Sequence, residues 1–299
     1  MNLVVQGEDI ATPDLKALHG IVRGTAIERI SDNAFRITAA DPGTREAVAA
    51  HCAAAKLDWG FMEEGRRFAD FRLLAMDMDS TLICIECIDE IADFAGRKAE
   101  VAAVTAAAMR GEIDWPESLK RRVAALSGLP ESTLARVYDE RLRFNPGAER
   151  LIAAARRHGV KTLLVSGGFT YFTDRVREQL KLDYAYSNVL VVEGGALKGT
   201  TMGALVDAGG KAGHVARLKR ELGIGRGQVL AIGDGANDLP MMAEAGTSIA
   251  YHAKPVVKER FATVGTDVAP LGPAELGKFI QSEVAHWAKL VKLAGIEPE

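Results

Sequence analysis

One apolar run that ends in two carboxylates constrains this chain more than any other stretch. Residues 71–76 have the length and the mostly apolar character of a buried strand, and Asp77 and Asp79 follow directly. Residues i and i+2 of an extended chain project to the same side, so the two carboxylates can share one face. Open parallel α/β sheets bind ligands at this carboxyl edge. Two close carboxylates repel each other, so the pair requires a cation, a shared proton or two different environments.

Two more predicted strands also end in residues that carry chemistry. Residues 160–165 lead into Ser166-Gly167, and residues 228–232 lead into Gly233-Asp234-Gly235-Ala236-Asn237-Asp238. Helical patterns follow, and another helix is expected to begin at Lys211. This alternation predicts an α/β fold with a doubly wound, mostly parallel sheet, which gathers the strand ends along one edge. Each motif alone is common in turns or on surfaces, but the combination favours a site.

A helical insertion separates the first of these strands from the others. Residues 88–142 carry several helical patterns, one of which starts at Trp115-Pro116-Glu117-Ser118. We therefore expect residues 87–145 to form a cap over the carboxyl edge of a core made of residues 71–86 and 146–299. Gly194-Gly195 predicts a hairpin between strands at 188–193 and 196–200. An amphipathic helix is expected at 274–293.

Residues 1–70 are expected to form a separate small α+β domain. Thr12-Pro13-Asp14 predicts a helix start with Thr12 at the cap. The predicted order β-α-β-β-α-β is the split ferredoxin-like arrangement. The layout resembles ACT-type regulatory modules, and the alternative is a packing or dimerisation domain without a ligand. The predicted strands are 3–6, 26–30, 34–38 and 58–62, and the second helix is 44–56.

Composition limits which binding partners and which cellular compartment can be expected for this chain. The net charge is −3 and no dense basic run is present, so neither nucleic acid nor an anionic membrane is expected to bind. The N-terminus lacks a signal-peptide pattern and no apolar run reaches membrane-spanning length, which predicts a cytoplasmic protein. Whether the chain forms a homodimer is left open.

The three cysteines, Cys52, Cys84 and Cys87, are too few and too uneven for a disulfide framework. Cys84-Ile85-Glu86-Cys87 has C-x-x-C spacing, which fits a redox or zinc site. Zinc requires a second ligand pair, and no pair has matching spacing. We favour two small apolar side chains at a helix start.

Over about residues 71–265 the chain resembles phosphatases of the haloacid dehalogenase superfamily. The four matching motifs are Asp77-Met78-Asp79-Ser80-Thr81, Ser166, Lys211 and Gly233-Asp234-Gly235-Ala236-Asn237-Asp238. Within that superfamily it is similar to the phosphoserine phosphatases, which carry a small helical cap. This closer resemblance rests on Glu86 in the first linker and, in the cap, on Met109, Trp115 and residues 118–123.

The expected chemistry is phosphoryl transfer, which requires positioning and charge stabilisation. Asp77 is the expected nucleophile, because a carboxylate can form an aspartyl-phosphate that water then hydrolyses. Asp79 is the expected general acid and base, which protonates the leaving oxygen and later deprotonates water. The remaining phosphate oxygens are expected to be held by Ser166, the Gly167 N–H and Lys211, with Asn237 orienting the phosphate or the lysine.

The predicted site needs a cation. One lysine cannot balance the carboxylates of Asp77, Asp79, Asp234 and Asp238, and Mg²⁺ suits such oxygen donors, although Mn²⁺ is an alternative. The resemblance implies one Mg²⁺ per site, held by Asp77, the backbone carbonyl of Asp79 and Asp234. Asp238 is then expected to support these ligands from outside.

The resemblance implies O-phospho-L-serine as substrate, with serine and phosphate as products of the last step of serine biosynthesis. Glu86 is expected to bind the ammonium group and Arg122 the carboxylate, with Arg121 as the competitor for that role. Trp115 and Met109 would either exclude water from the reaction or belong to the core of the cap. The alternatives are another capped phosphatase or a transferase to homoserine, a receiver-like signalling module, and an amino-acid sensor with an inactive catalytic part.

Overall fold

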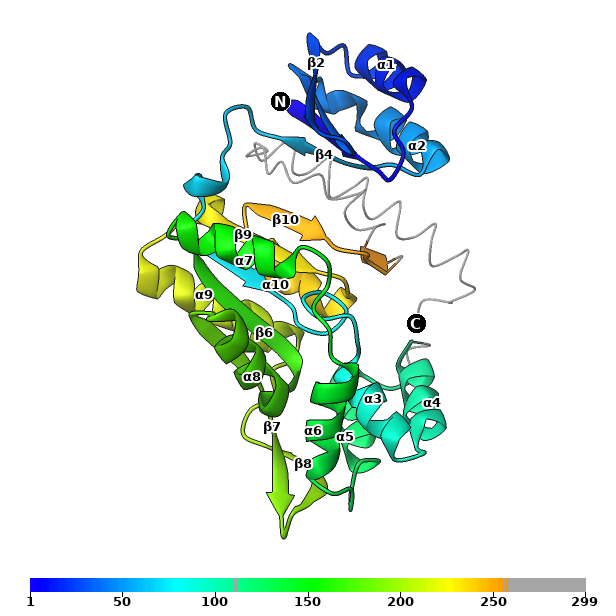
Figure 1. Cartoon of the computed structure of the whole chain (residues 1–299), viewed down its shortest axis with the longest axis vertical. Coiled ribbons are helices and arrows are strands. Elements are labelled where there is room, and N and C mark those ends of the chain that lie inside the picture. The colour runs from blue at the N-terminus through cyan, green and yellow to red at the C-terminus, as the bar shows by residue number, and fades with distance from the viewer. Residues whose placement is uncertain (110–111, 255, 258–299) are drawn as a thin grey trace, which may run out of the picture. The chain divides into compact units, whose positions relative to one another are not determined.

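The computed structural model describes residues 1–109, 112–254 and 256–257 (Figure 1). The predicted helix at 274–293 lies outside the described residues. The described part contains a six-stranded and a four-stranded sheet. The division of the chain at residues 70, 86 and 145 stays a prediction.

The six-stranded sheet has the strand order β10-β9-β5-β6-β7-β8. Neighbouring strands are parallel except β7 and β8, which form the antiparallel edge. The predicted doubly wound, mostly parallel sheet is therefore confirmed. The strands are β5 (Leu73–Met76), β6 (Lys161–Phe169), β7 (Tyr184–Glu193), β8 (Ala196–Met202), β9 (Val229–Gly233) and β10 (Thr247–Ala250).

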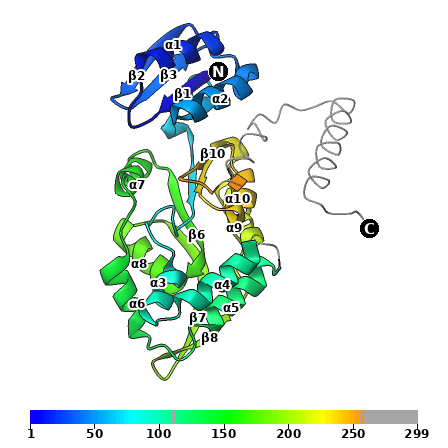
Figure 2. The same cartoon turned by 90° about the vertical axis from the view of Figure 1, so that its right-hand side faces the viewer.

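Alternate side chains of β5 reach the two faces of this sheet. Leu74 and Met76 pack with the helices on one face, and Leu73 and Ala75 pack with those on the other. Figure 2 shows α7 and α8 on one side of the strands and α9 and α10 on the other. The helices are α7 (Ala148–Arg157), α8 (Thr170–Leu180), α9 (Ala208–Leu222) and α10 (Leu239–Ala243). Because both faces are covered, the central strands β5 and β9 are apolar and buried throughout rather than alternating.

Strand β7 starts earlier than residue 188, where the sequence predicted it. Its first residues, Tyr184–Tyr186, pair in parallel with β6, whereas Val189–Glu193 pair with β8. The early part lacks the continuous apolar run of a core strand, and its pairing with β6 comes from tertiary structure.

The cap consists of α3 (Cys87–Phe94), α4 (Lys98–Met109), α5 (Trp115–Ala124) and α6 (Ser132–Arg136), followed by a π-helical turn at Val137–Arg141. Its two ends lie side by side, since Ile83 pairs with Phe144 and the Cys84 N–H donates to the Arg143 carbonyl at 2.9 Å. The insertion therefore leaves and rejoins the core at one place.

The β7–β8 hairpin is fastened to the cap by backbone hydrogen bonds. The Gly128 N–H donates to the Leu197 carbonyl and the Leu197 N–H donates to the Leu129 carbonyl, each at 2.8 Å. The Glu131 N–H donates to the Gly195 carbonyl at 2.8 Å. We call residues 128–131 with 195–197 the cap seam.

The four-stranded sheet has the order β2-β3-β1-β4, with every pair antiparallel. Its core of Leu3, Val5, Leu18, Ile37 and Val48 joins one face of the sheet to two helices. This is the predicted ferredoxin-like arrangement, whereas the resemblance to ACT modules stays a prediction. The elements are β1 (Asn2–Gln6), α1 (Thr12–Ile21), β2 (Ala26–Ser31), β3 (Ala34–Thr38), α2 (Arg45–Ala55) and β4 (Asp58–Met62).

The prediction that Thr12 caps helix α1 was wrong. Ala11 is the N-cap with extended backbone, Thr12 is already helical, and no side chain bonds to the helix start. Pro13 lies in the first turn of α1, where backbone N–H groups have no partner within the helix. Its missing N–H therefore costs no hydrogen bond when the helix starts at Thr12.

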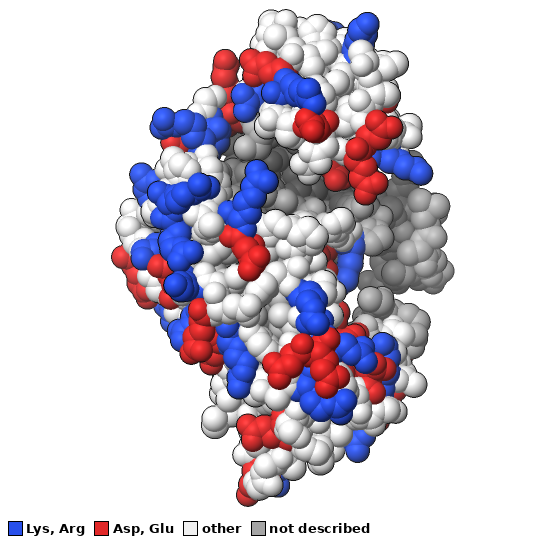
Figure 3. Space-filling model, viewed as in Figure 1, with Lys and Arg blue, Asp and Glu red and all other residues white. Residues whose placement is uncertain are grey.

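The surface mixes charges of both signs. On the face seen in Figure 3 many basic side chains lie beside acidic ones. On the cap, for example, Arg141 pairs with Glu90 and Asp93. Among the described residues, no helix combines the length and apolar character needed to cross a bilayer.

Candidate active site

The ends of three adjacent strands bring the predicted acidic residues together. Asp77 follows β5, and its N–H donates to the carbonyl of Ile232 on β9 at 3.0 Å. Asp234 follows β9, and Ser166 lies within β6 on the other side of β5. Residues far apart in sequence therefore meet at the carboxyl edge of the sheet, as expected for a parallel sheet.

Lys211 is the buried cation of this edge. It lies in the first turn of α9, where Asp207 caps the helix by accepting from the Gly210 N–H. Its Nζ lies 2.8 Å from Asp77 Oδ1 and 2.7 Å from Asp238 Oδ1. Burial alone would lower the pKa of Lys211, but these two carboxylates outweigh it and raise the pKa. The lysine is therefore held charged.

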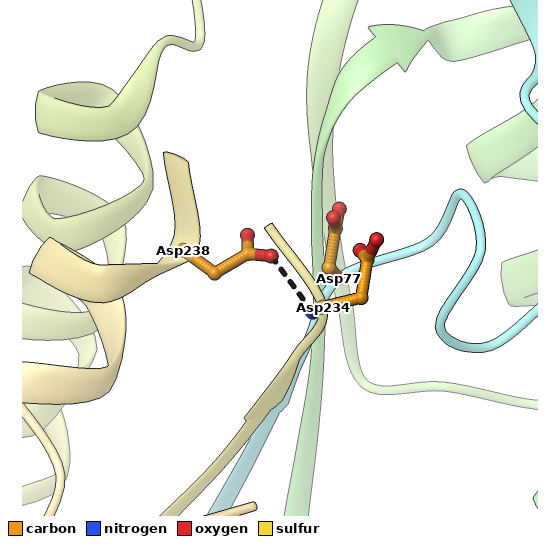
Figure 4. Close-up of side chains that lie close together, drawn as sticks. All are labelled: Asp77, Asp234 and Asp238. Carbon is orange, nitrogen blue, oxygen red and sulfur yellow. Dashed lines mark hydrogen bonds between the residues drawn. The ribbon is translucent and has the colours of Figure 1, made fainter. Parts of the chain in front are cut away.

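Asp238 is fully occupied by groups of the protein. Its Oδ1 faces Lys211, and its Oδ2 accepts the N–H groups of Asp234 at 3.1 Å and Gly235 at 3.0 Å. A Cβ on Gly233 would lie 2.5 Å from the Asp238 Cβ, so only glycine leaves room for this arrangement. Figure 4 shows Asp238 on one side, and the carboxylates of Asp77 and Asp234 side by side and pointing the same way.

The donor set fits a hard divalent cation. Asp77, Asp234 and Asp238 are buried and each offers an oxygen within 4.8 Å of the others. Asp77 Oδ1 already accepts from the Met78 N–H at 2.7 Å and from Lys211, which leaves its second oxygen. Burial first, and Asp238 next, raise the pKa of Asp77, and Lys211 offsets this only in part. A divalent cation would supply the missing positive charge.

Asp79 lies beside these groups but is more open to solvent. Its Oδ1 accepts from the Cys87 N–H at 3.3 Å. Burial, followed by the neighbouring Glu86, raises the pKa of Asp79 to about 7. A Cβ on Gly168 would lie 2.9 Å from Asp79 Oδ2 and 3.1 Å from Ser166 Oγ. Gly168, which sequence reasoning missed as a functional position, therefore provides the space around these two side chains.

The cap places a second group of charged residues near Asp79. Glu86 accepts a hydrogen bond from Ser80 Oγ at 2.9 Å, and Ser80 has a left-handed backbone with φ of 55°. Arg122 is partly buried, and its Nε has no partner among the described residues. Burial lowers the pKa of Arg122, and its acidic neighbours Asp89, Glu86 and Asp79 partly oppose this effect.

The two candidate arginines of α5 differ in environment. Arg121 is exposed and its Nε pairs with Glu117 one helical turn earlier at 2.7 Å. Arg122 is instead partly buried and has Asp89, Glu86 and Asp79 as its acidic neighbours. The apolar pattern of α5 indicates this difference. The buried Leu119 lies three residues before Arg122, and the buried Val123 lies one residue after it.

Trp115 closes the site over Gly167. A Cβ on Gly167 would lie 2.9 Å from Trp115 Cζ2, so the indole rests on this backbone. Ser166 is buried, and its Oγ accepts from the Gly168 N–H at 2.9 Å. Asn237 lies in the 3-10 turn Ala236–Asp238, between Asp234 and Asp238. The side chain of Met109 lies outside the described residues.

Sequence reasoning also missed two partners of Asp234. The Thr81 hydroxyl donates to Asp234 Oδ1 at 3.2 Å, and Lys254 Nζ lies 3.3 Å from Asp234 Oδ2. Thr81 belongs to the first motif, Asp77-Met78-Asp79-Ser80-Thr81, so the motif could have indicated it as a site residue. Lys254 follows β10 outside the motifs and could not have been found by their spacing.

The cysteines are free thiols. Cys87 is the first residue of α3 and is buried. Burial raises the pKa of its thiol, which disfavours the thiolate form. Cys84 is exposed and lies three residues before α3, so the expectation that both cysteines lie at a helix start holds for Cys87 and was wrong for Cys84. Cys84 instead pairs its backbone with the returning end of the cap.

Comparison with known proteins identifies the family. The family model for haloacid dehalogenase-like hydrolases matches residues 74–243. The chain belongs to the haloacid dehalogenase-like hydrolases. A second model, described as a domain of unknown function (DUF4072), matches residues 3–48.

Several relatives of this haloacid dehalogenase-like hydrolase are phosphoserine phosphatases. One from a Polaromonas species is 56% identical over 199 residues, which cover 65% of this chain and 84% of the relative. A probable phosphoserine phosphatase from Vibrio cholerae, solved without ligand, has a TM-score of 0.72 at 35% identity, covering 87% and 80% of the two chains. A phospho-aspartyl intermediate analogue of phosphoserine phosphatase has a TM-score of 0.60 at 37% identity, covering 64% and 90%.

Proposed function

We propose that this chain is a phosphoserine phosphatase that hydrolyses O-phospho-L-serine to L-serine and phosphate, the last step of serine biosynthesis. The observation that carries the proposal is the buried Lys211, which joins Asp77 to Asp238 next to Asp234 at the carboxyl edge of the sheet. The relatives that share most of the catalytic part support the choice of substrate.

Asp77 is the nucleophile of the proposed reaction. One of its carboxylate oxygens forms a bond to phosphorus while the bond from phosphorus to the serine oxygen breaks. Asp79, two residues on, gives its proton to that oxygen, and serine leaves. Asp79 then takes a proton from water, whose oxygen attacks phosphorus and releases phosphate and the free Asp77 carboxylate. The buried Lys211 keeps Asp77 in place throughout.

A Mg²⁺ ion would be held by Asp77, Asp234 and the backbone carbonyl of Asp79, while Asp238 fixes Lys211 and the backbone of Asp234. When bound, it supplies positive charge that offsets the charge of the phosphate and of the carboxylates. The phosphate oxygens would be bound by Ser166, the Gly167 N–H and Lys211, with Asn237 orienting the phosphate or Lys211.

The amino-acid end of the substrate would bind under the cap. Arg122 carries an unpartnered donor toward the site and suits a carboxylate, whereas Glu86 suits an ammonium group. Trp115, which rests on Gly167, would exclude water. A cytoplasmic location, an effector of the N-terminal sheet, a homodimer and the absence of nucleic-acid or membrane partners stay predictions.

The experiment is phosphate release from O-phospho-L-serine, O-phosphothreonine and O-phosphohomoserine, with Mg²⁺ or with EDTA. We expect phosphoserine to be the best substrate, EDTA to abolish turnover, and Mg²⁺ to restore it. Asp77→Asn should reduce turnover at least about 10³-fold, because the nucleophile is lost. Full activity after rigorous metal removal would contradict the metal, and substantial activity in a homogeneous Asp77→Asn preparation would contradict the nucleophile. Transfer to added homoserine would favour the transferase alternative.

A further inference from the structure

A second lysine, Lys254, enters the site from the segment that follows β10. Its N–H donates to the Asp234 carbonyl at 2.9 Å, and the Tyr251 N–H donates to the Gly233 carbonyl at 3.0 Å. The segment is thus fastened to the loop that carries Asp234. This backbone attachment fixes where the Lys254 side chain starts.

The ammonium group of Lys254 lies between two carboxylates. Its Nζ is 3.3 Å from Asp234 Oδ2 and 3.7 Å from Glu86 Oε1. The arrangement parallels Lys211, which lies between Asp77 and Asp238. The exposure of the two side chains differs, because Lys211 is 1% exposed and Lys254 is 48% exposed. Lys211 is locked in the core, whereas Lys254 can leave without unfolding its surroundings.

Lys254 and a bound cation would compete for the same charge. Asp234 is a ligand in the proposed metal site, its Oδ1 already accepts from Thr81, and its Oδ2 faces Lys254. A unit positive charge a few ångströms from a divalent cation opposes its binding even in a polar environment. The same charge stabilises Asp234 and Glu86 when no cation is present.

We propose that Lys254 is a positioning residue that stands in for the cation at Asp234, stabilises the metal-free site and lowers the affinity for Mg²⁺. This inference rests on the proposed metal site of the phosphatase. It assigns the two lysines separate tasks, since Lys211 holds the nucleophile and Lys254 balances the charge of the metal ligand and of Glu86.

The test measures Mg²⁺ affinity by isothermal titration calorimetry on the metal-stripped full-length chain, without substrate. Lys254→Met should lower the Kd for Mg²⁺ roughly tenfold, because the competing charge is gone. Its Tm in EDTA should fall by about 2 °C, and its Tm gain with Mg²⁺ should exceed that of the wild type. Lys254→Arg keeps the charge and should leave the Kd within about twofold of the wild type.

Lys198→Met is the matched control, because Lys198 pairs with the exposed Glu193 on the β7–β8 hairpin and should leave the Kd unchanged. An unchanged or higher Kd in Lys254→Met would overturn the proposal, as would equal tightening in Lys254→Arg or in Lys198→Met. A wild-type chain that binds no Mg²⁺ would overturn the proposed metal dependence as well. Normal Mg²⁺ binding without an effect of Lys254→Met would overturn this inference alone.

Discussion

The two ends of the site are built in different ways. At the proposed phosphate end Lys211, Asp77 and Asp238 are almost completely buried, and Lys211 pairs with both carboxylates. At the amino-acid end Arg122 Nε and Asp89 Oδ1 are buried and have no hydrogen-bond partner within the described part of the chain. Buried polar atoms in proteins are nearly always paired, so unpaired ones need an explanation. The proposed phosphate end is thus organised before substrate arrives, whereas the proposed amino-acid end has, among the residues that the structure describes, an unpaired donor on Arg122 and an unpaired acceptor on Asp89.

Of the substitutions that test this difference, the loss of Lys211 should have the largest effect on stability and turnover. In Lys211→Met, Asp77 and Asp238 lose their counter-charge in the core, so the free energy of unfolding should fall by about 3–5 kcal/mol. Turnover should fall roughly 10³-fold as well. Urea denaturation in EDTA and steady-state kinetics measure the two effects. Lys198→Met removes an exposed ion pair with Glu193 and should change the free energy of unfolding by less than about 1 kcal/mol. A Lys211→Met protein as stable as the wild type would show that the phosphate end is not held by this lysine.

Arg122 tests the other end. Arg122→Ala should raise the KM for phosphoserine roughly 10- to 100-fold, because a charged hydrogen bond to the substrate carboxylate is lost. The KM for O-phosphoethanolamine, which lacks a carboxylate, should change little. Arg121→Ala is the neighbouring control and should leave both KM values within about twofold, since Arg121 pairs with Glu117. An equal increase in KM for both substrates would show that Arg122 packs the cap and does not bind the substrate carboxylate.

Gly168 gives a smaller test of how closely the phosphate end is packed. Gly168→Ala places a methyl group against Asp79 Oδ2 and Ser166 Oγ, and should lower kcat roughly 3- to 30-fold through displacement of these groups. Gly213→Ala is the control, because a methyl group added there on α9 would meet no atom within 4 Å beyond the backbone of its own helix. That variant should keep kcat and gain about 0.5–1 kcal/mol of stability from helix propensity. A normal kcat in Gly168→Ala would mean that this end tolerates more movement than its contacts indicate.

The sequence predicted that Asp77 and Asp234 meet, because strand ends in a parallel sheet converge by topology. Asp77 and Asp234 each follow a strongly patterned strand, so their meeting required no knowledge of side-chain packing. Lys211 lies inside α9, and only the family resemblance placed it with them. The ferredoxin-like order of the first four strands followed in the same way from periodicity and turn residues.

The amino-acid end was harder to predict, since it depends on how the cap packs. Arg121 and Arg122 differ by one position, and only the burial of Leu119 and Val123 shows which of them faces inward. Lys254 and the early start of β7 depend on tertiary pairing and have no local pattern. Thr12 was taken for a cap because the residue type fits, while the backbone places that turn one residue earlier.

The cap seam also bears on how the cap is attached to the core. The backbone bonds between residues 128–131 and 195–197 tie one border of the cap to the β7–β8 hairpin as an additional strand would. The paired chain linkers at Cys84 and Arg143 hold the cap at a second place, so without the seam the cap would be attached to the core by its linkers alone. Changes to the cap that are meant to alter the choice of substrate should therefore leave these backbone bonds intact.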